Sequence, residues 1–324
     1  MKFATYEYDG VRCTGVVEGD LLHPVGESMQ QLLDGGLERA LDIGASARSG
    51  SSVAVSEVVL LAPLQPNTIR DFVAFEEHVE GVRRSVDGQM GVPDAWYEAP
   101  RFYFANPYTV SGPGAVIAPP EACRDLDFEL EVAAVIGKSG SSVTMRDAGT
   151  HIFGYTILND WSARDIQRRE MQVSLGPAKG KDFSNTLGPW IVTADEMHNH
   201  RDAEGFLDIS CTVDVNGVRV GHDWLANMGW SFDALVAYAS RDSWVHPGDV
   251  LGSGTVGNGG CLAELWGLRG EQIPPPLQVG DVVSMTVEGI GTLTNTVGES
   301  RPAPSVPAAR VVHHPRTREG HRGA

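Results

Sequence analysis

The chain reads Asp127-Phe128-Glu129-Leu130-Glu131-Val132 at a point where acidic and apolar side chains alternate strictly. Alternation with a period of two is typical of a β-strand, because residues two apart in a strand lie on the same face. Asp127, Glu129 and Glu131 should therefore line one face of this strand, with the apolar side chains on the other.

Two interpretations of the acidic face remain open. A strand with one solvated face is common and would account for the acids without any function. The face continues as Ala133 and Val135, however, so the acids enter apolar surroundings. Like charges there repel and lose hydration unless they are protonated or bridged by a cation. A hard divalent ion prefers such oxygen ligands, so we favour a metal site on this strand.

The rest of the chain predicts mainly β-structure. Its 324 residues include 38 Gly and 19 Pro, and short strands separated by turns dominate the pattern. Strands do not alternate with helices at βαβ spacing. We expect a mainly β fold with few helices (α+β), with a small N-terminal β domain over residues 1–62. A larger domain over 63–300 and a disordered tail over 301–324 should follow.

Three helices are predicted from apolar residues at helical spacing. They span 71–84, begin at the cap Ser162, and span about 228–240. In the first of them Asp71 is the predicted N-cap, and His78 follows about two turns later on the same helix face. The glycine- and proline-containing stretch 83–96 is expected to be a mobile loop.

Two further segments bear on the site. Asp160 ends an apolar strand at 154–160, where an acid is either a turn former or a metal ligand. Residues 252–257 match the GxGxxG pattern, but Asn258-Gly259-Gly260 follows and cannot open the helix that a dinucleotide site needs. We therefore interpret 252–257 as a glycine-rich turn.

Charge and composition exclude several classes of partner. The formal net charge of −17 argues against nucleic-acid binding, which needs an excess of Lys and Arg on some face. No apolar run has the length of a membrane span, and the first residues lack the apolar stretch of a secretory signal. Four scattered cysteines without CxxC spacing favour a reducing, cytoplasmic location.

Several motifs follow one another in a characteristic order. They are Asp71-Phe72-Val73-Ala74-Phe75-Glu76-Glu77-His78, Leu126-Asp127-Phe128-Glu129-Leu130-Glu131, Asn159-Asp160-Trp161-Ser162-Ala163-Arg164-Asp165-Ile166-Gln167, Gly180-Lys181-Asp182-Phe183 with Gly188-Pro189-Trp190, Gly254-Thr255, and Gly289-Ile290-Gly291-Thr292-Leu293-Thr294-Asn295. Together they resemble the fumarylacetoacetate hydrolase family over roughly residues 67–298.

The resemblance implies a mixed β-roll catalytic domain beside a small N-terminal β domain. It also implies a homodimer and one bound Mg²⁺, or Ca²⁺ or Mn²⁺ in its place. By motif, the metal ligands would be Asp71, Glu129, Glu131 and Asp160. Asp127 would then be only their neighbour.

The resemblance also implies roles for polar side chains around the ion. His78 matches the family's base, and Glu264 matches the acid that orients it. Lys181 matches a group that holds the oxyanion. The substrate would further be bound by Arg164, Gln167 and Thr255. Each of these has a structural alternative, such as a solvated helix face or a surface turn.

Two departures from the family pattern are visible. Val73 stands where the hydrolase that names the family usually has Tyr, so the acyl pocket should differ. Gly81 stands where some relatives carry the Glu that partners the His, so we prefer Glu264 for that role.

The expected substrate is a small-molecule oxo acid. The expected reaction is metal-dependent hydrolysis of a C–C bond in a 1,3-dicarbonyl compound of the fumarylacetoacetate or acylpyruvate type, by water that His78 activates. The alternative is a 2-oxo acid hydratase, decarboxylase or tautomerase that works through an enolate at the same metal. A catalytically silent scaffold is the alternative from a different class.

Overall fold

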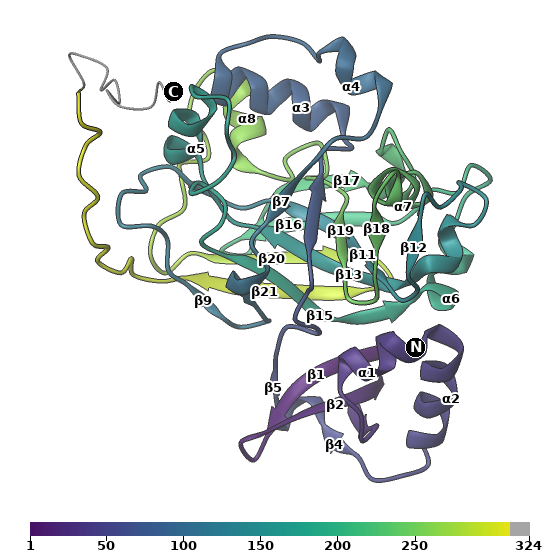
Figure 1. The fold of residues 1–324 in the computed structure, drawn as a ribbon. Helices are drawn as coiled ribbons and strands as arrows, with labels where there is room; N and C mark the ends of the chain where they lie inside the picture. Colours follow the sequence, from purple (N-terminus) through teal and green to yellow (C-terminus); the bar gives the residue numbers. More distant parts are fainter. Residues whose placement is uncertain (312–324) are drawn as a thin grey trace, which may run out of the picture.

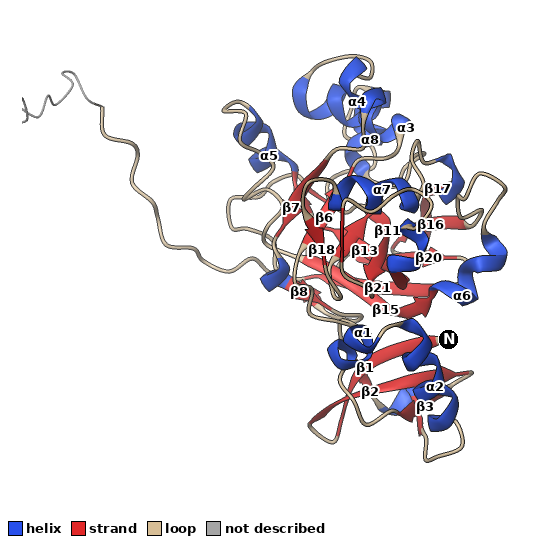
Figure 2. Cartoon of the chain, turned by 45° about the vertical axis from the view of Figure 1, so that its right-hand side comes forward, coloured by secondary structure: helices blue, strands red, loops and turns tan. Residues whose placement is uncertain are grey.

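The computed structural model describes residues 1–311. Two β-sheets form its centre, and the helices lie around them (Figures 1 and 2). This agrees with the predicted α+β class. No helix in the described part of the chain combines the length and apolar character needed to cross a bilayer.

The larger sheet has twelve strands. It contains strands of the N-terminal unit as well as strands of the rest of the chain. In order across the sheet they are β4 (Val53–Ala54), β3 (Leu21–Pro24), β2 (Val11–Glu18), β1 (Lys2–Tyr8), β15 (Asn185–Thr193), β13 (Ile152–Asp160), β11 (Leu130–Ile136), β19 (Val250–Gly252), β6 (Ile69–Phe72) and β7 (Phe102–Ala105), with β5 (Val59–Leu60) beside β1 and β8 (Val110–Ser111) beside β15. Most neighbours are antiparallel, whereas β19 pairs with β6, and β15 with β8, in parallel.

The smaller sheet has five strands and packs against the larger one. Its order is β17 (Val218–Trp224), β16 (Ser210–Val215), β20 (Val282–Val287), β21 (Gly291–Val297) and β9 (Val116–Ile117). Two short ribbons pair β10 (Leu126–Asp127) with β14 (Ser162–Ala163), and β12 (Gly140–Ser141) with β18 (Trp244–Val245). Leu130 and Val132 of β11 share one buried apolar cluster with Val213, Met285 and Leu293 of the smaller sheet.

Eight α-helices surround the sheets within residues 1–311. They are α1 (Met29–Gly35), α2 (Leu37–Ala47), α3 (Glu76–Val82), α4 (Asp94–Glu98), α5 (Arg164–Met171), α6 (Ala194–Met197), α7 (Phe232–Ser240) and α8 (Leu262–Arg269). A π-helical turn over Arg83–Asp87 extends α3. Helices α3, α4 and α8 gather at the end of the molecule opposite the N-terminal unit (Figures 1 and 2).

Strand β11 is buried on both faces. Ala133 and Val135 continue the acidic face and pack in a cluster with Phe3 and Leu187. The prediction that this face enters apolar surroundings is confirmed. The predicted strand is nevertheless interrupted, because residues 128–129 separate β10 from β11.

The helix predictions were wrong at their starts. Asp71 is not an N-cap: it lies in β6, where its register partners are Tyr103 of β7 and Gly252 of β19. The helix-like spacing arises because Phe72 of β6 and Val82 of α3 pack in the same apolar cluster. Ser162 belongs to β14, and α5 begins two residues later. The stretch 83–96 begins with a π-helical turn over Arg83–Asp87 and ends in α4, and only 88–93 between them is the predicted loop.

Residues 1–62 form β1–β5 and also two helices, α1 and α2, that the sequence patterns did not predict. Lys2 and Phe3 pair with Val192 and Ile191 of β15, so the large sheet continues from this unit into the rest of the chain. The domain limits 1–62 and 63–300 stay predictions. Of the predicted tail, 302–311 has no regular secondary structure, and 312–324 lies outside the described residues.

Candidate metal centre and active site

Four acidic residues from three strands of the large sheet approach one another. Glu131 lies in β11, Glu129 just before it, Asp71 in β6, and Asp160 at the end of β13. Ligand oxygens of Asp71, Glu129 and Glu131 all lie within 4.8 Å of one another. The backbone N–H of Glu129 donates to the Asn159 side chain over 3.1 Å, which fixes this acid against β13.

Gly252 makes the approach of two of these acids possible. It lies in β19, between the strands that carry Asp71 and Glu131. A Cβ atom at this position would come within 2.6 Å of Glu131 Oε2 and 2.9 Å of Asp71 Oδ1. The first glycine of the GxGxxG pattern therefore leaves space for carboxylates. The pattern opens no helix, as predicted.

The carboxylate cluster is short of hydrogen-bond donors. Asp71 Oδ1, Glu131 Oε1 and Asp160 Oδ1 are buried and have no hydrogen-bond partner among the described residues. Burial raises the pKa of all three carboxyls, and for Glu131 the nearby Asp71 and Glu129 raise it further. Unpaired buried oxygens are costly, and an all-oxygen donor set of this kind suits a hard divalent cation. The residues present fit Mg²⁺, Ca²⁺ or Mn²⁺.

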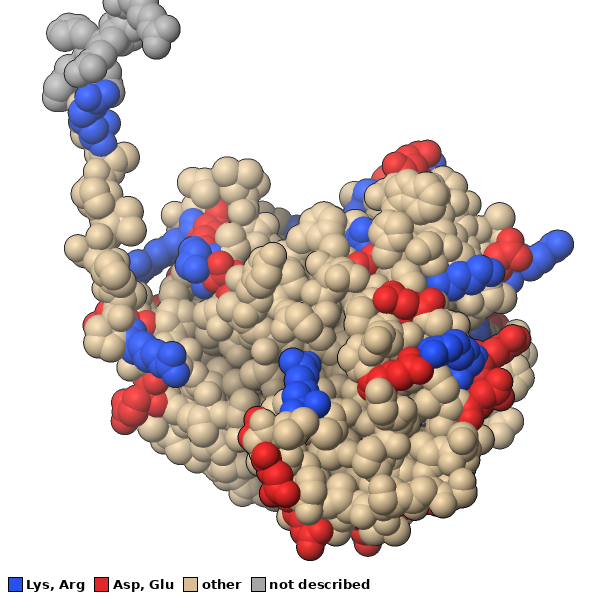
Figure 3. Space-filling model, turned by 60° about the horizontal axis from the view of Figure 1, so that its bottom comes forward, with Lys and Arg blue, Asp and Glu red and all other residues tan. Residues whose placement is uncertain are grey.

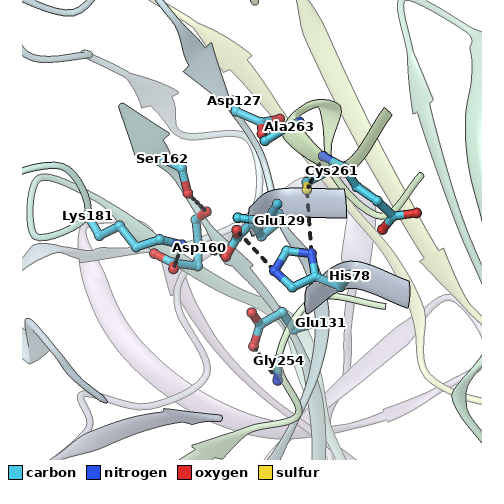
Figure 4. Close-up of polar contacts among 12 residues, drawn as sticks. His78, Asp127, Glu129, Glu131, Asp160, Ser162, Lys181, Gly254, Cys261 and Ala263 are labelled. Atoms are coloured by element: carbon cyan, nitrogen blue, oxygen red, sulfur yellow. Dashed lines mark hydrogen bonds and ion pairs between the residues drawn. The ribbon is translucent and has the colours of Figure 1, made fainter. Parts of the chain in front are cut away.

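Two cations lie on the other side of the cluster. Lys181 donates hydrogen bonds to Glu129 and Asp160 (Figure 4). Arg164 donates to Glu129 Oε1 over 2.6 Å. Although burial opposes it, these two charges hold the pKa of Glu129 well below its usual range. Tyr103 of β7 also donates to Asp160. Glu129 is therefore ionised and both of its oxygens are paired, whereas Asp71, Glu131 and Asp160 each keep one oxygen without a partner within residues 1–311.

Asp127 points away from the cluster and holds helix α8. Its oxygens accept from the backbone N–H groups of Leu262 and Ala263 over 2.8 and 2.9 Å. Arg164 Nε donates to the same carboxylate over 2.8 Å. The expectation from the alternating pattern, that three acids face one way, was wrong for Asp127. The break at residues 128–129 redirects it to the first turn of α8, where a negative charge is favourable.

His78 of α3 faces the cluster with one nitrogen and a cysteine with the other. Its Nε2 is 3.8 Å from Glu129 Oε1, and its Nδ1 is 3.6 Å from Cys261 Sγ (Figure 4). Burial lowers the pKa of His78 to about 4, and Arg164 and Lys181 add to this against the opposing charge of Glu129. The ring is therefore neutral near pH 7. Cys261 was missed because no spacing in the sequence marks it.

Glu264 does not orient His78 in this structure. No hydrogen bond joins the two side chains within residues 1–311; Glu264 Oε1 instead accepts the Gly259 N–H over 3.0 Å, and Oε2 has no partner there. Burial raises the pKa of Glu264 to about 7, although the Gly259 N–H opposes the rise. The acid lies on α8, a helix that the sequence patterns did not predict, where its backbone touches the turn of α3 that contains Gly81.

The other predicted substrate groups are buried near the cluster. Arg164 and Gln167 both belong to α5, and Arg164 donates to Gln167 Oε1 over 3.0 Å. Thr255 follows Gly254, whose N–H donates to Glu131 Oε2 over 3.1 Å. The Thr255 hydroxyl is buried and has no hydrogen-bond partner in the described residues.

Two cavities of about 270 Å³ flank these residues. One is mostly apolar and is lined by His78, Val73 and Trp96 together with other residues of α3 and α4. The other is lined by Tyr103 of β7 and by Lys181 with its neighbours. The site therefore has space on the histidine side and on the lysine side.

Comparison with known proteins identifies the family. Residues 67–298 match the model of the fumarylacetoacetate (FAA) hydrolase C-terminal domain. The chain belongs to this family. It is 30% identical to the oxaloacetate tautomerase YisK of Bacillus subtilis over 245 residues, which cover 75% of this chain and 74% of that protein. It is 29% identical to a fumarylacetoacetase of Dictyostelium discoideum over 245 residues, 62% of this chain.

A solved structure extends the likeness to the fold. The 5-carboxymethyl-2-hydroxymuconate delta-isomerase of Mycobacterium smegmatis superposes with a TM-score of 0.68 at 27% identity, covering 93% of this chain and all of that one. The match to the fumarylacetoacetase spans only 57% of that protein's length. Family members carry out tautomerisation, isomerisation and hydrolysis. Membership makes this chain an enzyme of the family but does not select among these reactions.

Proposed function

We propose that this protein enolises a small 2-oxo acid, as a tautomerase of the oxaloacetate type, at the carboxylate cluster. One observation carries the proposal: the Nδ1 side of His78 faces the thiol of Cys261 and no carboxylate. In hydrolytic triads a carboxylate bonded to the far nitrogen orients the imidazole and stabilises its protonated form. His78 lacks that support.

The weak basicity of His78 favours carbon acids over water. Its pKa lies near 4, mainly because it is buried. Removing a proton from water demands a strong base. The hydrogen next to a polarised 2-oxo group is far more acidic than water, so a weak base is sufficient. General-base assistance of this kind typically contributes about 10²–10⁴-fold in rate.

The carboxylate cluster supplies the electrophilic part of the site. A divalent ion held by Asp71, Glu129, Glu131 and Asp160 would polarise the 2-oxo group as a Lewis acid. The Lys181 ammonium, which lies against Glu129 and Asp160, would donate a hydrogen bond to the developing enolate oxygen.

The proton moves through one atom of His78. When the Nδ1 proton points to Cys261 Sγ, Nε2 is the free acceptor on the side of Glu129. This nitrogen takes the proton from the α-carbon and returns it to that carbon or to the enolate oxygen. The free hydroxyl of Thr255 is available to bind the substrate carboxylate.

C–C hydrolysis of a 1,3-dicarbonyl compound is the second candidate. The likeness to a fumarylacetoacetase favours it. In that reaction His78 would take the proton from water, and Glu264 would have to turn toward His78. The two reactions therefore differ in what they demand of Glu264.

The deciding experiment follows both reactions in one purified preparation with Mg²⁺. Deuterium exchange at C3 of oxaloacetate, monitored by NMR, reports enolisation, and product analysis with acylpyruvates and fumarylacetoacetate reports cleavage. We expect rapid exchange that is lost in Glu131→Gln and His78→Ala but retained in His222→Ala, which changes an exposed histidine of β17. Cleavage without accelerated exchange would instead establish the hydrolase.

We also propose that the protein is a homodimer. Tyr108 and Leu175 expose 91% and 82% of their surface, and Phe104 is exposed on β7, an edge strand of the large sheet. Broad areas without charged side chains occupy the face from which the C-terminal segment extends (Figure 3). Sedimentation equilibrium should give twice the chain mass, and Tyr108→Glu should shift it toward the monomer; a monomeric wild type would refute the proposal.

A further inference from the structure

An apolar cavity lies on the histidine side of the carboxylate cluster. It has a volume of about 270 Å³, and its walls include Val73, Val79, Val82, Trp96 and His78. An apolar cavity of about 150 Å³ is already large enough to bind benzene. This cavity can therefore hold an aryl ring or a branched alkyl chain.

The imidazole of His78 borders both the cavity and the carboxylate cluster. His78 lines the cavity, and its Nε2 lies 3.8 Å from Glu129 Oε1 (Figure 4). Val73 connects the two a second time. A Cβ atom at Gly254 would come within 2.8 Å of Val73 Cα, and the Gly254 N–H donates to Glu131 Oε2 over 3.1 Å. A group that starts at the cluster and passes His78 therefore enters the cavity.

The aromatic wall of the cavity is fixed by contacts within the protein. Trp96 of α4 is buried, and its indole N–H donates to the Val73 carbonyl oxygen over 2.7 Å. Its ring packs edge-on against Trp230 with the ring centroids 4.6 Å apart, and a Cβ atom at Gly229 would lie 2.8 Å from it. Because this wall is already ordered, a ligand that contacts it does not lose affinity to the cost of ordering it.

Two arginines also line the cavity, and both donate to acceptors of the protein. Arg83 donates to the carbonyl oxygen of Gly91. Arg101 is exposed, and it donates to the Ala95 carbonyl oxygen over 3.3 Å and forms an ion pair with Glu98 at 3.5 Å. A carboxylate of the substrate would compete with these contacts, whereas an apolar group needs only the apolar walls. The cavity therefore favours an uncharged group.

We propose that the preferred substrates are 2-oxo acids whose C3 carries an aryl or branched alkyl group, and that this group occupies the cavity. The placement of C3 rests on the proposed function, in which His78 Nε2 removes a proton from that carbon. The carboxylate and the 2-oxo group then lie toward the cluster and Lys181, where the second cavity is lined by polar residues that include Asn106 and Asp182. Val73 and Trp96 are the residues that determine specificity.

Three unreactive analogues measure this preference without turnover. N-phenyloxamate has the shape of phenylpyruvate, but an N–H replaces C3 and cannot be enolised. Oxamate lacks the ring, and N-oxalylglycine carries a second carboxylate instead of it. Calorimetric titration at saturating Mg²⁺ gives the Kd of each analogue.

We expect N-phenyloxamate to bind at least about 10-fold more tightly than oxamate, since even one methylene in a hydrophobic pocket is worth about 10–200-fold. Its binding should also have the more negative heat-capacity change, which marks burial of apolar surface. N-oxalylglycine should bind no more tightly than oxamate.

Variants that fill the cavity test where the ring binds. Val73→Phe should reduce the ratio of the oxamate Kd to the N-phenyloxamate Kd by at least about 10-fold, and the ratio cancels any loss of metal affinity that both analogues share. Val82→Phe fills the cavity from α3 if Val73→Phe does not fold. Val218→Phe, which changes an exposed valine of β17, is the matched control and should keep the wild-type ratio.

The outcomes separate this inference from the proposed function. Equal Kd values for N-phenyloxamate and oxamate in the wild type, tightest binding of N-oxalylglycine, or an unchanged ratio in a folded filled variant would overturn the inference and leave the proposed function standing. If none of the three analogues binds, the cluster is not a site for 2-oxo acids, and the proposed function fails together with the inference.

Discussion

Replacing Glu264 with Gln should change the pH dependence of stability in a defined direction. Glu264 is fully buried on α8, and its carboxyl accepts the Gly259 N–H while Oε2 has no partner among residues 1–311. Burial, with Asp223 and Glu77 nearby, raises its pKa from 4.5 to about 7. The folded protein therefore holds a proton on this group over a pH range in which the unfolded chain has lost it.

The sign and size of the effect follow from linkage. Between pH 4.5 and about 7 the folded state binds more protons than the unfolded state, so this group's contribution to stability is present below pH 4.5 and is lost as pH rises to about 7. Each pH unit corresponds to about 1.4 kcal/mol, so the loss over this interval is about 3 kcal/mol. Gln cannot titrate and can still accept the Gly259 N–H. The free energy of unfolding of Glu264→Gln relative to wild type should therefore rise by about 3 kcal/mol from pH 4.5 to 7.5.

Urea unfolding, followed by circular dichroism at half-unit steps of pH with chelator present, measures this difference. Glu271→Gln, which changes an exposed acid just after α8, is the matched control and should track the wild type at every pH. A difference between Glu264→Gln and wild type that stays constant across the range would refute the raised pKa. A fall in turnover as deep as that of His78→Ala would show that Glu264 orients the histidine after all.

Three further changes test other parts of the structure. Glu131→Gln should abolish the rise in melting temperature that Mg²⁺ causes, and an unchanged Mg²⁺ shift in calorimetry would contradict this. The metal-free variant should be at least as stable as wild type, because burial and neighbouring acids raise the pKa of Glu131. Asp127→Ala should lower the free energy of unfolding by about 3–5 kcal/mol, because the buried Arg164 guanidinium and the first turn of α8 lose this carboxylate. A loss below about 1 kcal/mol in urea unfolding would show that Asp127 does not stabilise them. Gly81→Ala should cost about 1–3 kcal/mol, since its Cβ would lie 2.6 Å from Glu264 Cγ and 2.9 Å from Glu264 Cα, and full stability in the same assay would mean that α3 and α8 can separate.

At the acidic strand the sequence pattern predicted two of the three acid positions. Burial of Glu129 and Glu131 followed from the alternation of residues 127–132 and from the apolar residues after them. Asp127 followed the same pattern but faces α8, because two residues leave the strand between β10 and β11. A period-two pattern fixes the side of a strand only while the strand remains continuous.

Local patterns misplaced Asp71 for a related reason. Apolar residues at helical spacing continue from β6 into α3, since both elements face the same core. The hydrogen bonds that decide between strand and helix come from β7 and β19, which lie about 30 and 180 residues away in sequence. No local window contains them, and tertiary pairing overrides local propensity.

By itself the sequence determined the α+β class and the family, and it predicted which acids lie close together, because residue types and their order record these directly. The partner of His78 was decided only by the tertiary structure. The contact of α3 with α8 brings Cys261 to the imidazole and leaves Glu264 on the Gly259 N–H. That choice depends on how two helices pack through Gly81 and Gly267, and close backbone packing between distant segments leaves no local periodicity in a sequence.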